Sequence, residues 1–175
     1  TGEHAGMTQT EVVRSGTDRD ERRPGRLRDN LVRQKRKNAR TMRRDWANEN
    51  LIPGATFERH SFDKILVDAP CTNTGVMRRR VDVRWRLRPD DFVRMQAQQL
   101  AILRAVAPFL KPAGSLVYST CSLEPEENEE VVAAFLRDHP GFRLTNEKRS
   151  LPFRDRFDGA FAARLELSSC SCSCS

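Results

Sequence analysis

Three side chains that could carry out chemistry follow two apolar stretches of the sequence. Asp68 and Cys71 come directly after the run Lys64–Val67, and Cys121 follows the run Ser115–Tyr118. A thiolate is a strong nucleophile, and a carboxyl group can bind or protonate a polar ligand. Taken singly, a cysteine after a strand is more often a small buried side chain than a reactive one. The chemical interpretation therefore depends on whether the fold brings the three side chains together.

Short apolar runs alternate with longer segments of helical periodicity along most of the chain. The runs before Asp68 and Cys121 contain β-branched or aromatic residues, which is typical of buried strands in a parallel sheet. Pro89 begins a segment with apolar residues at helical spacing, and Pro125 begins another whose glutamates suit the helix dipole. The expected elements are strands at 11–13, 64–67, 115–118 and 160–167, and helices at 26–38, 89–110 and 124–138.

This alternation predicts an open α/β sheet, in which ligands bind outside the carboxyl ends of the strands. The three candidate side chains all follow predicted strand ends, so we expect them at one edge of the sheet. Residues 1–167 are interpreted as one domain, and residues 168–175 as a low-complexity tail. The tail contains Cys170, Cys172 and Cys174. No histidine or second cysteine cluster completes a tetrahedral site with them, so no metal is expected.

Charge and hydropathy restrict the class of partner. Lys and Arg outnumber Asp and Glu by 31 to 24, which gives a formal net charge of +7. A basic, arginine-rich chain favours an acidic polymer such as nucleic acid. No apolar run approaches the ~20 residues of a membrane span, and the first residues lack the apolar stretch of a signal peptide. We therefore expect a cytoplasmic, monomeric protein that does not enter a membrane.

Two longer motifs surround the candidate side chains. The first, DAPCTNTGVMRRRVDVRW, runs from Asp68 to Trp85, and the second, YSTCSLEPEEN, runs from Tyr118 to Asn128. Both resemble signatures of the Nop/Sun family of RNA 5-methylcytosine methyltransferases, and the segment DGAFAARL from Asp158 resembles that family's closing strand. The resemblance implies a Rossmann-like S-adenosylmethionine-dependent methyltransferase fold, with a mostly parallel sheet and helices on both faces. It also implies methylation of cytosine C5 in RNA, with ribosomal RNA as the expected substrate.

The resemblance assigns roles to the two internal cysteines and the aspartate. Cytosine C5 is a poor nucleophile, so a thiolate first adds to C6 and makes C5 reactive. By the family pattern Cys121 is this nucleophile, and Cys71 is placed to help remove the C5 proton so that the adduct can be released. Asp68 is expected to bind the N3/N4 edge of cytosine, the amino acid end of the cofactor, or both.

Further contacts to S-adenosylmethionine are expected from two aspartates nearer the N-terminus. Asp18 resembles the acidic residue that holds the ribose hydroxyls, and Asp45 resembles the one near the adenine. The family's glycine-rich cofactor turn belongs upstream of Asp18, but the chain begins at Thr1 without it. We therefore expect an N-terminally truncated catalytic domain that lacks its first strand and this turn. A catalytically impaired RNA-binding fragment is one alternative, and a DNA cytosine C5-methyltransferase, in which Cys71 would form the adduct, is another.

An arginine-rich loop directly follows the first cysteine. Charge runs are usually solvated surface, but this loop also contains an aromatic residue and adjoins the candidate site. Arginines suit backbone phosphates, and an exposed aromatic ring suits a stacked base of single-stranded RNA. Because the target base must leave its stack to reach Cys121, the substrate is expected to be a loop or an opened helix. The predicted RNA-binding residues are Arg78, Arg79, Arg80, Arg84 and Trp85.

Overall fold

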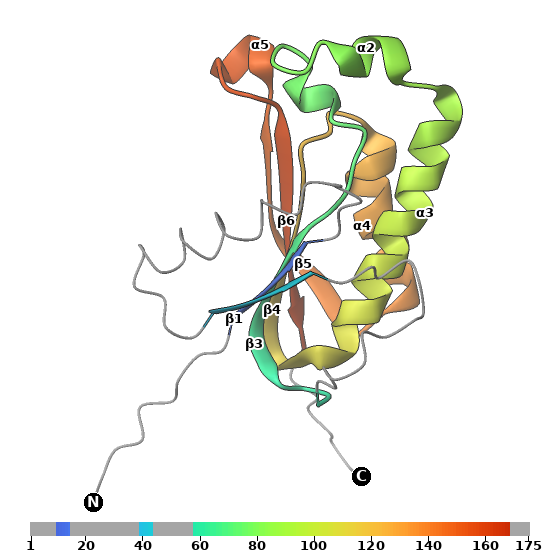
Figure 1. Ribbon diagram of the computed structural model, residues 1–175. Coiled ribbons are helices and arrows are strands. Elements are labelled where there is room, and N and C mark those ends of the chain that lie inside the picture. The colour runs from blue at the N-terminus through green and yellow to red at the C-terminus, as the bar shows by residue number, and fades with distance from the viewer. Residues whose placement is uncertain (1–9, 15–38, 44–57, 169–175) are drawn as a thin grey trace, which may run out of the picture.

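A computed structural model describes residues 10–14, 39–43 and 58–168 of the chain (Figure 1). These residues form a six-stranded sheet with the strand order β2-β1-β3-β4-β6-β5. The first four strands in this order run parallel, and β6 runs antiparallel to both of its neighbours. The strands are β1 (Thr10–Arg14), β2 (Ala39–Arg43), β3 (Phe62–Asp68), β4 (Leu110–Thr120), β5 (Phe142–Ser150) and β6 (Ala160–Leu167).

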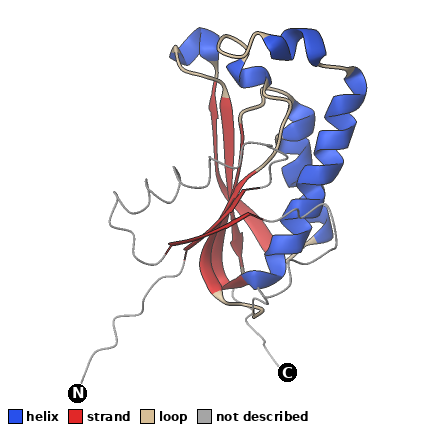
Figure 2. Cartoon of the chain, in the orientation of Figure 1, coloured by secondary structure: helices blue, strands red, loops and turns tan. Residues whose placement is uncertain are grey.

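Two longer helices, α3 (Pro89–Val106) and α4 (Glu129–Asp138), cover one face of the sheet (Figures 1 and 2). Two shorter helices, α2 (Asp82–Arg86) and α5 (Pro152–Asp155), lie at one end of the molecule. The helix predicted at 26–38 lies outside the described residues. In the described part of the chain, no helix combines the length and the apolar character that crossing a membrane requires.

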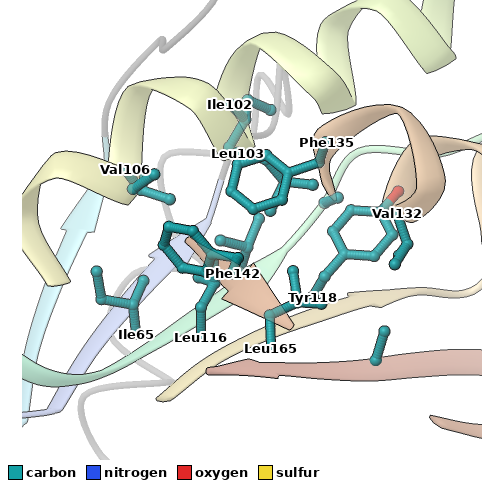
Figure 3. Packing of buried hydrophobic residues seen from close by; sticks show 14 of the residues in the cluster. Ile65, Ile102, Leu103, Val106, Leu116, Tyr118, Val132, Phe135, Phe142 and Leu165 are labelled. Atoms are coloured by element: carbon teal, nitrogen blue, oxygen red, sulfur yellow. The ribbon is translucent and has the colours of Figure 1, made fainter. Parts of the chain in front are cut away.

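The core lies between the sheet and the two long helices (Figure 3). Ile102 and Leu103 of α3 are fully buried, as are Leu116 of β4 and Leu165 of β6. Phe135 of α4 packs among them, and such residues each contribute about 1.5–3 kcal/mol when they leave water. This packing holds the carboxyl ends of β3 and β4 in a defined position.

Most predicted elements are present, but several boundaries differ from the sequence-based expectation. The predicted helix at 89–110 ends at Val106, because a 3-10 turn that contains Pro108 follows it and Leu110 already belongs to β4. The helix predicted at 124–138 is interrupted at Asn128, which separates the 3-10 turn Pro125–Glu127 from α4. Strands β2 and β5 were not predicted. Every residue of β5 from the second to the seventh is exposed, so the strand lacks the apolar alternation that reveals a half-buried strand.

Candidate active site

The structure brings Cys71 and Cys121 into direct contact. Cys71 lies in the loop after β3, and Cys121 lies directly after β4, the parallel strand beside it. Their Sγ atoms are 3.2 Å apart, which is a hydrogen-bond distance for thiols, and both side chains are half-buried. The expectation that the two loops meet at one edge of the sheet is therefore confirmed.

Asn73 extends this contact into a chain of hydrogen bonds. Its backbone adopts the left-handed conformation at φ 64°, which asparagine tolerates better than most residues. Its Nδ2 donates to the Cys71 carbonyl at 2.8 Å, which turns Oδ1 toward Cys121. The Cys121 thiol can then donate to Oδ1 at 3.1 Å. Asn73 was not among the predicted site residues, although it lies within the first motif.

The thiol contact separates the acidities of the two cysteines. The pKa of Cys121 is lowered, chiefly because the Cys71 S–H group donates to Cys121 Sγ and stabilises its thiolate, while burial and the charge of Asp68 oppose this. The pKa of Cys71 is raised by the same hydrogen bond, by burial and by the negative charge of the Cys121 thiolate. Cys121 is thus the thiol that ionises first, and its charge keeps Cys71 protonated.

Asp68 ends β3 and is half-buried at the same edge of the sheet. The register of β3 and β4 pairs Asp68 with Ser119, two residues before Cys121, and the negative charge of Asp68 opposes the lowering of the Cys121 pKa. Asp68, Cys71 and Cys121 therefore converge as predicted. Asp18 and Asp45 lie outside the described residues. In the ranges that are described, no group of three or more His, Cys, Asp or Glu side chains could hold a metal ion.

A buried carboxylate, Glu127, joins the two cysteine loops. One carboxylate oxygen accepts from the Thr72 backbone N–H at 2.9 Å and from Gln99 Nε2 at 3.1 Å. The other accepts from the hydroxyls of Thr72 and Ser122, both at 2.5 Å. Thr72 follows Cys71 and Ser122 follows Cys121, so one side chain ties both loops together.

The exposed fraction of Glu127 is 0%, whereas the sequence indicated only a glutamate in the first turn of a helix, where it suits the helix dipole. Its buried role was not predicted, because it depends on the turn at Asn128 that directs Glu127 inward. Gln99 was missed for a related reason. It is also fully buried, and its Nε2 donates to the Pro70 carbonyl at 2.8 Å as well as to Glu127. A lone polar residue within an apolar helical stripe was the only available signal.

Two glycines allow the backbone of three loops to pack closely beside the cysteines. Gly75 donates its N–H to the Cys121 carbonyl at 2.9 Å, and Gly159 donates to the Gly75 carbonyl at 2.8 Å. A Cβ atom on Gly75 would lie 2.4 Å from the Gly159 carbonyl oxygen and 2.7 Å from that of Cys121. These are backbone atoms that cannot move aside cheaply, so the contact requires glycine.

The arginine-rich loop lies beside this site, but its arginines differ in their surroundings. Asp158 forms ion pairs with Arg78 at 2.6 Å and with Arg79 at 3.0 Å, and all three side chains are at least partly exposed. Arg80 and Arg84 are exposed, and no described carboxylate lies within ion-pair distance of either. The predicted RNA-binding group therefore contains two arginines that also hold the loop before β6 in place.

A profile of the family described as 16S rRNA methyltransferase RsmB/F matches residues 3–166. The ribosomal RNA small subunit methyltransferase B of Yersinia pseudotuberculosis is 37% identical over 155 residues, which is 85% of this chain and 35% of that protein. The probable ribosomal RNA small subunit methyltransferase B of Bacillus subtilis is 51% identical over 98 residues, which is 55% of this chain and 22% of that protein. The chain thus spans about a third or less of these relatives' length.

The crystal structure of NSun6 from Pyrococcus horikoshii, solved with SFG, superimposes with a TM-score of 0.66 and 28% identity. The match covers 90% of this chain and 41% of that one. The described residues have the α/β fold of S-adenosylmethionine-dependent methyltransferases, which confirms the predicted fold class.

Proposed function

Since this chain belongs to the RsmB/F family of 16S rRNA methyltransferases, we propose that it methylates cytosine C5 in small-subunit ribosomal RNA. The proposed route is a covalent adduct between Cys121 Sγ and cytosine C6. The observation that carries this proposal is the 3.2 Å contact between two thiols of opposite pKa shift. The Cys121 thiol ionises first and can attack, and the Cys71 thiol keeps its proton until Cys121 has reacted.

The reaction begins with Cys121. Its thiolate adds to C6, the C5–C6 electron pair moves into the C4–C5 bond, and the C4–N3 pair moves to N3, which accepts a proton. C5 of the resulting enamine is then nucleophilic and can take a methyl group. Asp68 lies within electrostatic reach of Cys121, which supports a role at the N3/N4 edge of the base or at the cofactor. Because the Cys121 Sγ atom becomes an uncharged thioether, the charge that raised the pKa of Cys71 disappears at this step.

Cys71 acts in the second half of the reaction. Without the neighbouring thiolate, its thiol can release its proton to solvent and then accept the proton from methylated C5. The electron pair of the C5–H bond re-forms the C5–C6 double bond, and the C6–Sγ bond breaks to return Cys121 as a thiolate. N3 gives up the proton that it accepted, which leaves neutral 5-methylcytosine. Asn73 holds both cysteines in place through its carboxamide.

The described residues fit S-adenosylmethionine at one position. Asp68 lies at the carboxyl end of β3, where open α/β sheets bind ligands, and its carboxylate can accept hydrogen bonds from the cofactor's amino group. The related protein NSun6 was solved with SFG, an S-adenosylmethionine-related ligand. Asp18 and Asp45 remain predictions. When bound, the cofactor supplies an electrophilic methyl group.

The pKa directions favour this proposal over DNA methylation through Cys71. In the DNA alternative the cysteine of the Pro-Cys pair attacks, yet here that thiol is the one whose pKa is raised. RNA is favoured further by the loop with Arg80, Arg84 and Trp85, whose exposed side chains can bind phosphates and stack on bases.

The proposal is tested with the protein as expressed from its own gene. It is incubated with methyl-labelled S-adenosylmethionine and unmodified 16S ribosomal RNA, and the nucleosides are separated by mass spectrometry. The label is expected in 5-methylcytidine, and Cys121→Ser should abolish it, whereas Cys170→Ala in the tail should not. Label in a different nucleoside, or transfer that survives Cys121→Ser, would contradict the mechanism. No transfer to any RNA would favour the binding-fragment alternative.

A further inference from the structure

Three aromatic side chains are exposed in the described part of the chain, and all three lie in segments attached to the cysteine site. Trp85 belongs to α2 and is 81% exposed. Phe153 of α5 is 83% exposed, and Phe157, directly after α5, is 72% exposed. Figure 1 shows α2 and α5 at the same end of the molecule. Exposed phenylalanines are costly for solubility, so a pair of them in one short turn indicates a binding role.

Two kinds of contact attach this turn to the site. The Gly159 N–H donates to the Gly75 carbonyl, and the Gly75 N–H donates to the Cys121 carbonyl. Asp158, between Phe157 and Gly159, binds both Arg78 and Arg79. The two phenylalanines are therefore fixed to the same backbone network as the proposed nucleophile.

Charge indicates what kind of partner this surface takes. Residues 78–88 contain six arginines and one aspartate, a net charge of +5. Residues 153–158 contain two arginines and two aspartates, so the turn leaves this net charge unchanged even though Asp158 pairs with Arg78 and Arg79. An apolar protein partner would have to desolvate these guanidinium groups, whereas phosphates would neutralise them and bases could stack on the rings.

We propose that Phe153 and Phe157 form a base-stacking platform for single-stranded RNA beside the cysteine site. The nucleotides next to the target cytosine stack on the two rings, and the arginines of residues 78–88 bind their phosphates. This inference rests on the proposed function, because it assumes an RNA substrate, and it adds a contact surface to that of Trp85 at the same end of the molecule.

The test measures binding of a cytosine-containing single-stranded RNA by fluorescence anisotropy at fixed salt. The probe contains the target sequence identified by nucleoside mapping, or a mixed-sequence oligonucleotide if no target is found. Compared variants are Phe153→Ala, Phe157→Ala, the double variant and Phe153→Tyr. Leu144→Ala is the matched control, because Leu144 is an exposed apolar residue on β5 away from this end.

Each phenylalanine-to-alanine change should weaken binding about tenfold, because each removes one stacking surface. Phe153→Tyr and Leu144→Ala should bind like the unmodified protein, and all variants should keep its melting temperature because the side chains are exposed. Unchanged affinity in the double variant would overturn the platform while leaving methyl transfer and the Cys121 adduct intact. Failure of the unmodified protein to bind any RNA would overturn both the platform and the proposed function.

Discussion

The substitution Glu127→Gln separates the charge of the buried carboxylate from its shape. The amide oxygen can replace the carboxylate oxygen that accepts from the Thr72 N–H and from Gln99. The amide nitrogen then faces the hydroxyls of Thr72 and Ser122, which can rotate to accept from it. The substitution therefore keeps four hydrogen bonds but removes the negative charge that strengthens each of them.

The expected cost follows from those four bonds. A hydrogen bond to a charged group contributes about 1.5–3 kcal/mol, and a neutral one about 0.5–1.5 kcal/mol, so each bond loses about 1 kcal/mol. Because the four share one side chain, their losses are not additive, and we expect the free energy of unfolding to fall by about 2–4 kcal/mol. For a chain of this size the melting temperature should drop by about 5–15 °C.

Thermal unfolding monitored by circular dichroism measures this loss, with Glu126→Gln as the matched control. Glu126 occupies the same 3-10 turn but is exposed, so its substitution should change stability by less than about 0.5 kcal/mol. If Glu127→Gln is as stable as Glu126→Gln, the four bonds do not depend on the charge of Glu127, and its assigned role in joining the cysteine loops is wrong.

Three further predictions concern the site and its surface. The rate of iodoacetamide labelling of Cys121 should rise with pH around a midpoint below that of an ordinary thiol. Cys71→Ala should move this midpoint upward, because the S–H group that donates to Cys121 is lost. An unmoved midpoint would refute the effect of Cys71 on the pKa of Cys121. Gly75→Ala should lower the free energy of unfolding, measured by urea titration, by about 1–3 kcal/mol. Gly141→Ala should be tolerated, because the added Cβ would lie 3.5 Å from the nearest atom, Cδ1 of Leu167. Arg84→Gln should reduce the salt dependence of RNA binding by about 0.7 in log–log slope, and an unchanged slope would remove it from the phosphate contacts.

The central sheet could be predicted from the sequence because its strands are buried and apolar. Ile65 and Leu116 are at most 2% exposed, and each lies in a short run that could be recognised without the structure. The same rule failed for β5, whose second to seventh residues are all exposed and which therefore carries no apolar pattern. A polar edge strand is specified by its pairing with β6 and not by its own sequence.

The two cysteines and Asp68 could be selected because they follow strand ends, and parallel strands end at a common edge. The residues that hold them could not be selected in the same way. Glu127 is 55 residues from Thr72, and Arg78 is 80 residues from Asp158, so neither pair is visible before the chain is folded. A buried acid and a surface acid look alike in a sequence, and only the turn at Asn128 distinguishes them.

The most direct test of the proposed mechanism is a denaturing gel for protein–RNA adducts. The protein as expressed from its own gene is incubated with S-adenosylmethionine and 16S ribosomal RNA. Four forms of the protein are compared: the wild type, Cys71→Ala, Cys121→Ala and the double variant. Cys71→Ala should accumulate an adduct that survives denaturation, because release needs the second thiol, and the added Cys121→Ala change should abolish it. An adduct that forms in Cys121→Ala but not in the double variant would show that Cys71 is the nucleophile and contradict the account, and an adduct in the double variant would show that neither thiol forms it.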